Sequence, residues 1–374
     1  MRAVIVRTMP DESLSMDVYA NGLVGGLRTV YPDWKVIEVA PNPLNKNKGN
    51  NSLTAGLRKY YERFWRYPHN VMRQEADIFH VVDHSYAHLV YWLKRAGKSV
   101  VVTCHDLINF FYPENLYSRA RLPSVAMTLW KFSVQGMRRA DHIITVSYCT
   151  ARDVKQLLHI KPERITVIPD AVDSQFRPLP KEEVESFRQQ HGLSRETICL
   201  LHVGTVQERK NIFTILRVLE ALKIRELPVH LWKTGEDFTA EQKAFIQNRG
   251  LQGSVTYLGR VDKHVLVQVY NAADILLFPS LYEGFGMPVL EAMACGTPVI
   301  TSNVSSLPEV AGDAAILVEP MDVRAMVEAI VHIWNDPDYR SYLIKKGFDR
   351  VKRFTWETVA KQVAEIYEKV RSRV

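Results

Sequence analysis

Two glutamates, Glu283 and Glu291, stand eight residues apart in the stretch SLYEGFGMPVLEAMACGTPVI (280–300). Glu291 stands among the apolar residues Leu290, Ala292 and Met293, and an acidic group with such neighbours near a strand end is more often an acceptor for hydroxyl groups than a surface charge. In a helix, eight residues advance by about 800°, which is about 80° beyond two turns, so both side chains could reach one site. The simpler alternative makes Glu283 a helix cap and Glu291 a solvated helix residue.

The turn between the two glutamates has features of a ligand-binding loop. Gly284 and Gly286 allow the backbone to approach a ligand closely, and Pro288 suits the first turn of a helix, where its missing N–H costs nothing. The free N–H groups at the start of that helix favour phosphate or hydroxyl oxygens. A glycine pair alone is a weak signal, so the surrounding elements must decide.

Short apolar runs rich in Val and Ile alternate with helical patterns along the whole chain, which predicts parallel sheets covered by helices. The expected strands are 2–8, 34–40, 77–82, 99–104, 142–147 and 164–169 in the first half, and 198–204, 229–234, 254–259, 274–280, 298–302 and 314–319 in the second. Two series of six strands predict an α/β protein with two doubly wound, Rossmann-like domains. Ligands of such sheets bind at the carboxyl ends of the strands, so we expect the domains to face each other across a ligand-binding cleft.

The domain boundary is expected in PDAVDSQFRPLPKEE, which carries three prolines and the polar residues of a linker. We predict an N-terminal domain at 1–175 and a C-terminal domain at 176–355. The last segment, 356–374, has apolar residues at helical spacing and is expected to pack back toward the N-terminal domain.

The basic charge of the chain is concentrated in its first half. Residues 1–180 contain 24 Lys and Arg against 16 Asp and Glu, a balance of +8, whereas residues 181–374 contain 24 against 25, a balance of −1. A basic half could face nucleic acid, an anionic membrane surface or an acidic substrate, or have an ordinary solvated surface.

One segment of the first half, 45–70, mixes basic and aromatic residues. Arg58, Lys59, Arg63 and Arg66 interleave there with Tyr60, Tyr61, Phe64 and Trp65. Such a mix is typical of a membrane interface or of a site for an acidic acceptor, and the alternative is a surface helix with half-buried aromatics. Among these partners we favour an anionic membrane surface and expect no nucleic acid.

The remaining composition predicts a cytoplasmic protein that can associate peripherally with the inner face of a membrane. The sequence has no apolar stretch long enough to span a membrane, and its N-terminus lacks the pattern of a signal peptide. The cysteines, at 104, 149, 199 and 295, form no CxxC pair and are expected to be reduced and mostly buried.

The run FPSLYEGFGMPVLEAMACGTPVITSNVSSLPEVAGDAAILVEP (278–320) closely resembles the signature of glycosyltransferase family 4. Members of that family have the GT-B fold and use nucleotide-activated sugars with retention of anomeric configuration. The resemblance extends through VIPDAVDSQFRP, LHVGTVQERKN, LVQVYNAADILLFPS and FTWE. It covers the second half of the chain and, more loosely, the first.

The resemblance implies that Glu291 binds the ribose of a donor nucleotide, and that Glu283 with the following turn holds the donor sugar and phosphates. It places Lys210 at a phosphate-binding position with Arg209 beside it, and two such cations can offset charge on a departing diphosphate without a metal. Many members carry arginine where this chain has Thr205, so Arg209 is expected to substitute. The full donor set is Gly204, Thr205, Arg209, Lys210, Arg260, Val261, Glu283, Gly284, Phe285, Gly286, Met287, Pro288, Val289 and Glu291, with Arg260 and Val261 against the base.

In the first half, His105 ends the strand SVVVTC, where similar enzymes have a histidine that contacts sugar hydroxyls. With Arg209, Lys210 and Glu283 it completes the expected catalytic set. His84, also at a strand end, and Ser15 are candidates for the acceptor side. The glycine pair that the family often has after the first strand is absent, and Ser13, Ser15 or a shifted loop is expected to replace it.

We therefore predict a retaining hexosyltransferase that uses a nucleotide diphosphate sugar and a saccharide or lipid-linked acceptor, with no cofactor and no metal. The alternatives are a sugar-nucleotide epimerase of the same architecture and a catalytically silent sugar-nucleotide-binding protein. A nicotinamide-dependent dehydrogenase is disfavoured, because no GxGxxG follows RAVIVRT or ICLLHVG.

Overall fold

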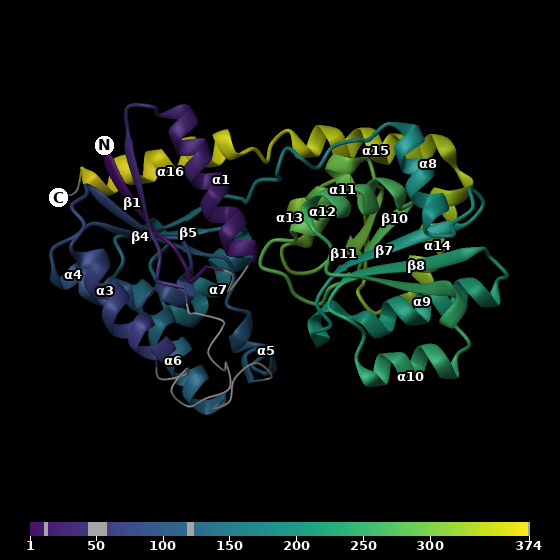
Figure 1. Ribbon diagram of the computed structural model, residues 1–374, viewed down its shortest axis with the longest axis horizontal. Coiled ribbons are helices and arrows are strands. Elements are labelled where there is room, and N and C mark those ends of the chain that lie inside the picture. Colours follow the sequence, from purple (N-terminus) through teal and green to yellow (C-terminus); the bar gives the residue numbers. More distant parts are fainter. Residues whose placement is uncertain (11–13, 44–57, 118–122, 373–374) are drawn as a thin grey trace. The chain divides into compact units, whose positions relative to one another are not determined.

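The computed structural model describes all residues except 11–13, 44–57, 118–122 and 373–374. The chain divides into two compact units, one made of Met1–Ala171 with Thr355–Val374 and one made of Val172–Phe354 (Figure 1). The division thus falls after Ala171, four residues before the boundary expected from the prolines, and the last helix belongs to the first unit.

The first unit is built on a six-stranded parallel sheet with the order β2-β1-β3-β4-β5-β6. Its strands are β1 (Arg2–Val6), β2 (Lys35–Val39), β3 (Ile78–Val81), β4 (Val100–Cys104), β5 (His142–Thr145) and β6 (Ile165–Val167). Its helices include α1 (Leu14–Val30), α3 (Tyr67–Met72), α4 (Leu89–Arg95), α5 (Glu114–Tyr117), α6 (Pro123–Gln135), α7 (Tyr148–Leu158) and α16 (Trp356–Arg371).

Alternation along the strands places two cores on the two faces of this sheet. In β1, Val4 and Val6 face a core that α3, α4, α6 and α7 complete, whereas Ala3 and Ile5 face a core completed by α1 and α16. Strands covered on both faces need apolar residues at every position, which explains the runs RAVIV and VVVTC.

The C-terminal helix α16 packs on α1 through two glycines of α1. A Cβ on Gly22 would lie 2.0 Å from Cε2 of Trp356, and a Cβ on Gly26 would lie 2.5 Å from the Trp356 carbonyl oxygen. These glycines therefore let two helices approach closely. Gly22 is the first glycine after β1. It lies within α1, where it packs against Trp356 of α16.

The second unit has a six-stranded parallel sheet with the order β12-β11-β10-β7-β8-β9. Its strands are β7 (Ile198–Gly204), β8 (Val229–Gly235), β9 (Val255–Gly259), β10 (Ile275–Phe278), β11 (Val299–Ser302) and β12 (Ile316–Val318). Its helices include α8 (Lys181–Gln190), α9 (Ile212–Ile224), α10 (Ala240–Asn248), α11 (Lys263–Ala272), α12 (Met287–Cys295), α13 (Leu307–Ala311), α14 (Val323–Asn335) and α15 (Pro337–Val351).

The strand orders identify both units as doubly wound α/β folds, which confirms the predicted fold class. All twelve expected strands form, and each lies within its expected range except β8, which extends one residue beyond it. In the second unit, chain order reverses between β7 and β10, which are neighbours in the sheet. The carboxyl ends of strands at such a switch point are where these folds bind ligands. The loops after β7 and β10 are therefore the place to look for a site.

Candidate active site

The loops after β7 and β10 are tied together by both backbone and side chains. Leu281 N–H donates to the carbonyl oxygen of Arg209 at 2.7 Å. Lys210 Nζ donates to Glu283 Oε1 at 2.6 Å, and the Arg209 guanidinium donates to Glu283 Oε2 at 2.8 Å. The structure thus brings together three residues that the sequence analysis singled out.

This cluster is shielded from solvent. The side chains of Lys210 and Glu283 are each 9% exposed, and that of Arg209 is 14% exposed. Burial raises the pKa of Glu283, but the charges of Lys210 and Arg209 outweigh it and lower that pKa to about 2. Because the two cations stand just before the N-terminus of α9, where the helix dipole disfavours positive charge, Glu283 supplies the compensating negative charge.

Glu283 is not a helix cap. Helix α12 begins at Met287, and its N-cap residue Gly286 has φ 117°, with no side chain capping the helix. A Cβ on Gly286 would lie 2.8 Å from Cδ2 of Leu307, so glycine is required for both reasons. The helical rotation estimated between Glu283 and Glu291 is therefore wrong, because Glu283 lies in the loop and Glu291 is in the second turn of the helix.

Two serines from the loop after β11 hold the backbone of Glu283, and the sequence analysis missed both. Ser305 Oγ accepts from Glu283 N–H at 3.0 Å, and it lies 2.6 Å from the Glu283 carbonyl oxygen. Ser306 Oγ lies 2.6 Å from the Phe285 carbonyl oxygen. The only signal in the sequence was their place before LPEVAGDAA.

Glu291 projects from α12 toward α11 and is not a solvated helix residue. Its Oε2 accepts from the Tyr270 hydroxyl at 2.7 Å. Burial raises the pKa of Glu291 to about 7, against the lowering effects of the Tyr270 hydrogen bond and of Lys263. The Tyr270 hydrogen bond engages Oε2 of the partly buried Glu291. The other carboxylate oxygen can accept hydrogen bonds from hydroxyl groups of a ligand. Tyr270 was not predicted as a site residue.

The carboxyl ends of β7, β8 and β9 are linked by Glu236. Its N–H donates to the Gly204 carbonyl oxygen, and its carboxylate accepts from Val206 N–H and lies 3.4 Å from Arg260. The fully buried Lys233 donates to the carbonyl oxygens of Gly204 and Glu236. Neither Lys233 nor Glu236 was predicted, since nothing in their spacing marks them.

Next to this link, Gly204 has φ 145°, and the Thr205 hydroxyl is buried without a hydrogen-bond partner among the described residues. A buried, unpaired hydroxyl is costly unless a ligand or water satisfies it. Arg260 follows β9 and has a side chain that is 74% exposed, with Val261 beside it. These four residues of the predicted donor set share one edge of the sheet.

The other predicted donor residues lie in the loop before α12 or in its first turn. Phe285 is buried, and its ring lies 6.0 Å from that of Phe354. Pro288 occupies the first turn, as expected. Gly284 precedes Phe285, Met287 opens the helix, and Val289 is fully buried, so Val289 can contribute only through its backbone.

In the first unit, His105 follows β4 and is buried. Its Nε2 lies 2.9 Å from the Val82 carbonyl oxygen and must therefore carry the hydrogen, which leaves Nδ1 facing Asp170 Oδ2 at 3.9 Å. Burial raises the pKa of Asp170 to about 6, and His105 opposes that rise. Asp170 was not predicted, although it stands in the quoted VIPDAVD.

The two acceptor candidates lie in different surroundings. His84 is buried after β3, with Nδ1 3.5 Å from Asp83 Oδ1 and its ring 6.2 Å from that of Trp130. Ser15 is exposed in the first turn of α1. No contact joins these residues in the described structure. Ser13, the other serine suggested to replace the glycine pair, lies outside the described residues.

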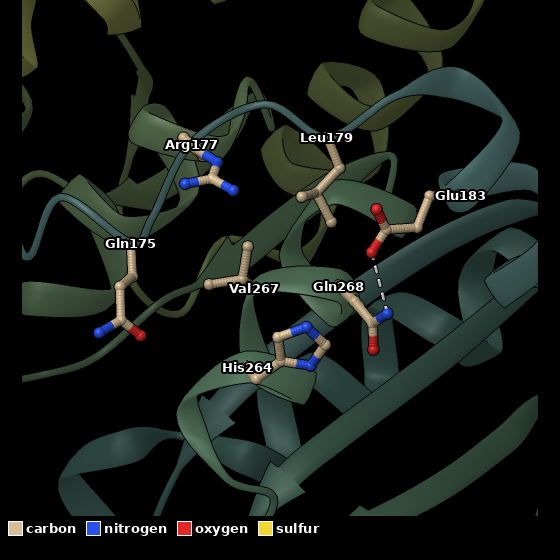
Figure 2. A pocket seen from close by; sticks show the side chains of 7 residues that line it. All are labelled: Gln175, Arg177, Leu179, Glu183, His264, Val267 and Gln268. Carbon is tan, nitrogen blue, oxygen red and sulfur yellow. Dashed lines mark hydrogen bonds between the residues drawn. The ribbon is translucent and has the colours of Figure 1, made fainter.

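A small cavity of about 150 Å³ lies elsewhere in the second unit (Figure 2). It is lined by Gln175, Arg177, Leu179, Glu183, His264, Val267 and Gln268. In Figure 2 the amide of Gln268 donates to Glu183, at 3.0 Å. The cavity contains none of the predicted site residues, so we do not place the chemistry there.

The described residues form neither a metal centre nor a membrane-spanning helix. No group of three or more His, Cys, Asp or Glu side chains in the described ranges could hold a metal ion. No helix in the part of the chain that the structure describes is long and apolar enough to cross a bilayer. All four cysteines are among the described residues, and all four are buried.

Comparison with known families agrees with this architecture. The model for glycosyl transferases group 1 matches residues 183–350, and the model for glycosyltransferase family 4 matches residues 17–176. The chain is 31% identical over 291 residues to O-antigen chain mannosyltransferase B of Escherichia coli, covering 76% of this chain and 74% of that protein. The chain therefore belongs to glycosyltransferase family 4: it transfers a sugar from a nucleotide sugar.

Other known proteins are similar to the chain in sequence or in fold. O-antigen chain mannosyltransferase RfbU of Salmonella typhimurium is 28% identical over 269 residues, covering 70% of each chain. Sucrose-phosphate synthase from Thermosynechococcus elongatus has the same fold, with a TM-score of 0.77, 21% identity and full coverage of both chains. Anabaena HepE, in its complex with UDP-glucose, has a TM-score of 0.76 at 17% identity, covering 99% of this chain and 100% of that one. The fold is thus GT-B, and the transferase relatives favour transfer over the epimerase alternative.

Proposed function

We propose that the protein is a retaining hexosyltransferase of saccharide biosynthesis, which transfers a hexose from a nucleotide diphosphate sugar to a saccharide or lipid-linked acceptor. The observation that carries this proposal is the buried cluster of Arg209, Lys210 and Glu283 at the switch point of the second sheet. Two relatives of the chain are O-antigen chain mannosyltransferases, which favours mannose as the hexose.

The donor is proposed to lie along the carboxyl edge of the second sheet. Lys210, Arg209 and the unpaired Thr205 hydroxyl would bind its phosphates, because cations and hydroxyl donors match phosphate oxygens. Glu283 would accept from hydroxyl groups of the sugar, and Glu291 from those of the ribose. The base would lie near Arg260 and Val261. The complex of HepE with UDP-glucose supports a nucleoside diphosphate as the leaving group.

The chemistry proposed for this arrangement needs no metal and no cofactor. As the bond from the anomeric carbon to the diphosphate breaks, negative charge grows on the phosphate oxygens, and two buried cations in place beforehand stabilise it. Retention then follows from attack of the acceptor oxygen on the face that the diphosphate leaves, with the acceptor's hydroxyl proton passing to an oxygen of the departing diphosphate. His105, whose Nδ1 faces away from its Val82 contact, is proposed to contact the sugar.

The acceptor is proposed to bind the first unit, where His84 and Ser15 are the candidate contacts. The basic balance of residues 1–180 fits an acidic or lipid-linked acceptor, with an anionic membrane surface as an additional partner on the cytoplasmic side.

The test is a donor panel. The full chain is incubated with GDP-mannose, UDP-glucose and other nucleotide sugars, with and without EDTA, in the presence of lipid and oligosaccharide acceptor pools. Release of nucleoside diphosphate together with a new α-linked product supports the proposal. Isomerised donor without nucleotide release would favour the epimerase, binding without turnover would favour the silent binder, and loss of turnover in EDTA would contradict the metal-free mechanism.

A further inference from the structure

Two titratable side chains of the first unit, His105 and Asp170, face each other at the carboxyl ends of its strands. His105 directly follows β4, and Asp170 comes three residues after β6. His105 Nδ1 lies 3.9 Å from Asp170 Oδ2, which is too far for a direct hydrogen bond. An oxygen atom placed between them can lie about 2.8 Å from both. Because the side chains are only 7% and 12% exposed, hydrogen bonds made there are poorly screened by water.

The ring of His105 is held in one orientation. Its Nε2 donates to the Val82 carbonyl oxygen at 2.9 Å, which directs Nδ1 toward Asp170. The ring of Tyr19 meets it edge to face, with ring centroids 4.7 Å apart. The Tyr19 hydroxyl is in turn hydrogen-bonded to the Thr103 hydroxyl at 3.0 Å. These contacts fix the direction in which Nδ1 offers or accepts a hydrogen bond.

The carboxyl group of Asp170 lacks the hydrogen bonds that a buried carboxylate needs. Its Oδ1 is buried and has no hydrogen-bond partner among the described residues. A buried carboxylate without donors is costly, so burial favours the protonated form. Burial accordingly raises the pKa of Asp170 to about 6, and the charge of His105 opposes that rise. The pair therefore holds a proton at a pH where an exposed carboxyl group has lost it.

The neighbouring titratable groups do not compete for this proton. Tyr19 faces the pair from α1 and His80 from β3, and burial raises the pKa of Tyr19 well above its usual range and lowers that of His80 to about 3. Burial and nearby carboxylates raise the pKa of Cys104, the residue before His105; those carboxylates are Asp106, Asp83 and Asp153. Tyr19, His80 and Cys104 thus stay neutral between about pH 5 and 8, which leaves His105 and Asp170 to exchange the proton.

We infer that His105 and Asp170 share one proton and together bind one hydroxyl group of a saccharide between them. A hydroxyl group donates one hydrogen bond and accepts another, so it fits a pair of which one member carries a proton and the other does not. Either His105 Nδ1–H donates to the hydroxyl oxygen and the hydroxyl donates to Asp170, or both directions reverse. Without the proton, the two groups are both acceptors and compete for a single hydrogen.

This inference rests on the proposed function, in which His105 contacts the sugar, and adds Asp170 and the proton to that contact. The unligated pair releases its proton as pH rises above about 6, whereas the pair that binds a hydroxyl group retains it. Binding of the sugar should therefore take up a proton near neutral pH. It should also weaken about tenfold as pH rises, which corresponds to the loss of one hydrogen bond.

The experiment is titration calorimetry of the full chain between about pH 5 and 9 with GDP-mannose and GDP, and with UDP-glucose and UDP. The ratio of the two affinities in each pair isolates the contribution of the sugar. We expect this ratio to fall about tenfold with rising pH, and buffers of different ionisation enthalpy to reveal uptake of a proton. The native chain thus tests the inference without any substitution.

Two variants of Asp170 separate the proton from the side chain's shape. The amide in Asp170→Asn offers one donor and one acceptor without titrating, so the affinity ratio near pH 6 should stay within about threefold of the native value and lose its pH dependence. Asp170→Leu should lower the ratio about tenfold near pH 6. The matched control is Asp141→Asn at the amino end of the same sheet, where Asp141 accepts from Val100 N–H and pairs with Lys94. It should leave the profile unchanged.

A ratio that is independent of pH in the native chain, or that varies equally in Asp170→Asn, would overturn the inference. The affinities for GDP and UDP alone report the donor site, so retained nucleotide binding in that case leaves the proposed function standing. Failure of all four nucleotides to bind would instead count against the proposed function. Thermal unfolding of each variant establishes that it folds.

Histidine NMR of the chain without nucleotide tests the shared proton directly. His105→Gln assigns the signal of His105 by its loss. We expect His105 to titrate at a lower pH in Asp170→Asn than in the native chain, because the carboxylate stabilises the imidazolium, and to titrate as in the native chain in Asp141→Asn. Identical titration of His105 in the native chain and in Asp170→Asn would overturn the inference whichever nucleotides bind.

Discussion

Lys210 and Glu283, 73 residues apart in the chain, form a buried ion pair of 2.6 Å, and Arg209 engages the second carboxylate oxygen at 2.8 Å. The cations proposed to bind the donor phosphates are thus engaged by the carboxylate proposed to hold the donor sugar. The phosphates must therefore share both cations with Glu283, which makes the energies of the three groups interdependent.

Glu283→Gln should separate nucleotide binding from transfer. Removing the carboxylate charge leaves Lys210 and Arg209 more available to a diphosphate, so we expect a nucleoside diphosphate to bind up to about tenfold more tightly. Transfer should fall by about 100-fold, because the sugar loses an acceptor of its hydroxyl groups. Calorimetry with GDP and UDP and steady-state kinetics measure the two effects. Unchanged or weaker affinity for both nucleotides would show that Glu283 does not compete with the phosphates.

Lys210→Met should lower kcat/KM by about 100-fold or more, because one of two cations facing the leaving group is lost. It should also lower the free energy of unfolding by up to about 3 kcal/mol, because a buried carboxylate is left with Arg209 alone. The double variant Lys210→Met/Glu283→Gln should regain stability but not activity. Denaturant unfolding and donor turnover check this, and a fully active Lys210→Met would falsify the site.

Glu291 should make stability depend on pH. Its pKa is raised from 4.5 to about 7 in the folded chain, so the folded state binds more protons than the unfolded state between these values. The contribution of Glu291 is thus complete below pH 4.5 and is lost as pH rises through 7. Glu291→Gln should remove this part of the decline in thermal unfolding profiles, whereas the exposed control Glu196→Gln should not. The same slope in both variants would mean that other groups carry it.

The glycines of α1 offer a matched pair of substitutions. Gly22→Ala places a methyl group 2.0 Å from the Trp356 ring and should destabilise the first unit by about 1–3 kcal/mol. Gly25→Ala meets no atom within 4 Å and should stabilise α1 by about 0.5–1 kcal/mol. Adding Trp356→Ala should relieve the clash in Gly22→Ala. Thermal unfolding of the variants measures these changes in stability. Equal effects of Gly22→Ala and Gly25→Ala would contradict the close packing of α1 and α16.

Much of this fold could be predicted because parallel strands covered on both faces must be largely apolar, as Ala3–Val6 and Val100–Val102 are. The same strand pattern predicted that Arg209, Lys210 and Glu283 follow strand ends. It did not predict that they contact one another. Their contact depends on β7 and β10 being neighbours, which is a property of strand order and not of any local pattern.

Other parts of the site could not be predicted, since they depend on long-range backbone geometry. Ser305 and Ser306 bind the backbone of Glu283, and Tyr270 binds Glu291, through contacts that common residue types make in many proteins. The rotation expected between Glu283 and Glu291 failed because the positive φ of Gly286 delays the start of α12 to Met287.

The path of the chain bears on how the protein is made. Residues 1–171 leave the ribosome before residues 172–354, but the core between α1 and the sheet also needs Val359, Val363 and Tyr367 of α16, which are synthesised after residue 354. The second unit, 172–354, is therefore complete before α16 is. We expect this unit to finish folding first during synthesis, while the first unit waits for Thr355–Val374 with part of its apolar surface uncovered.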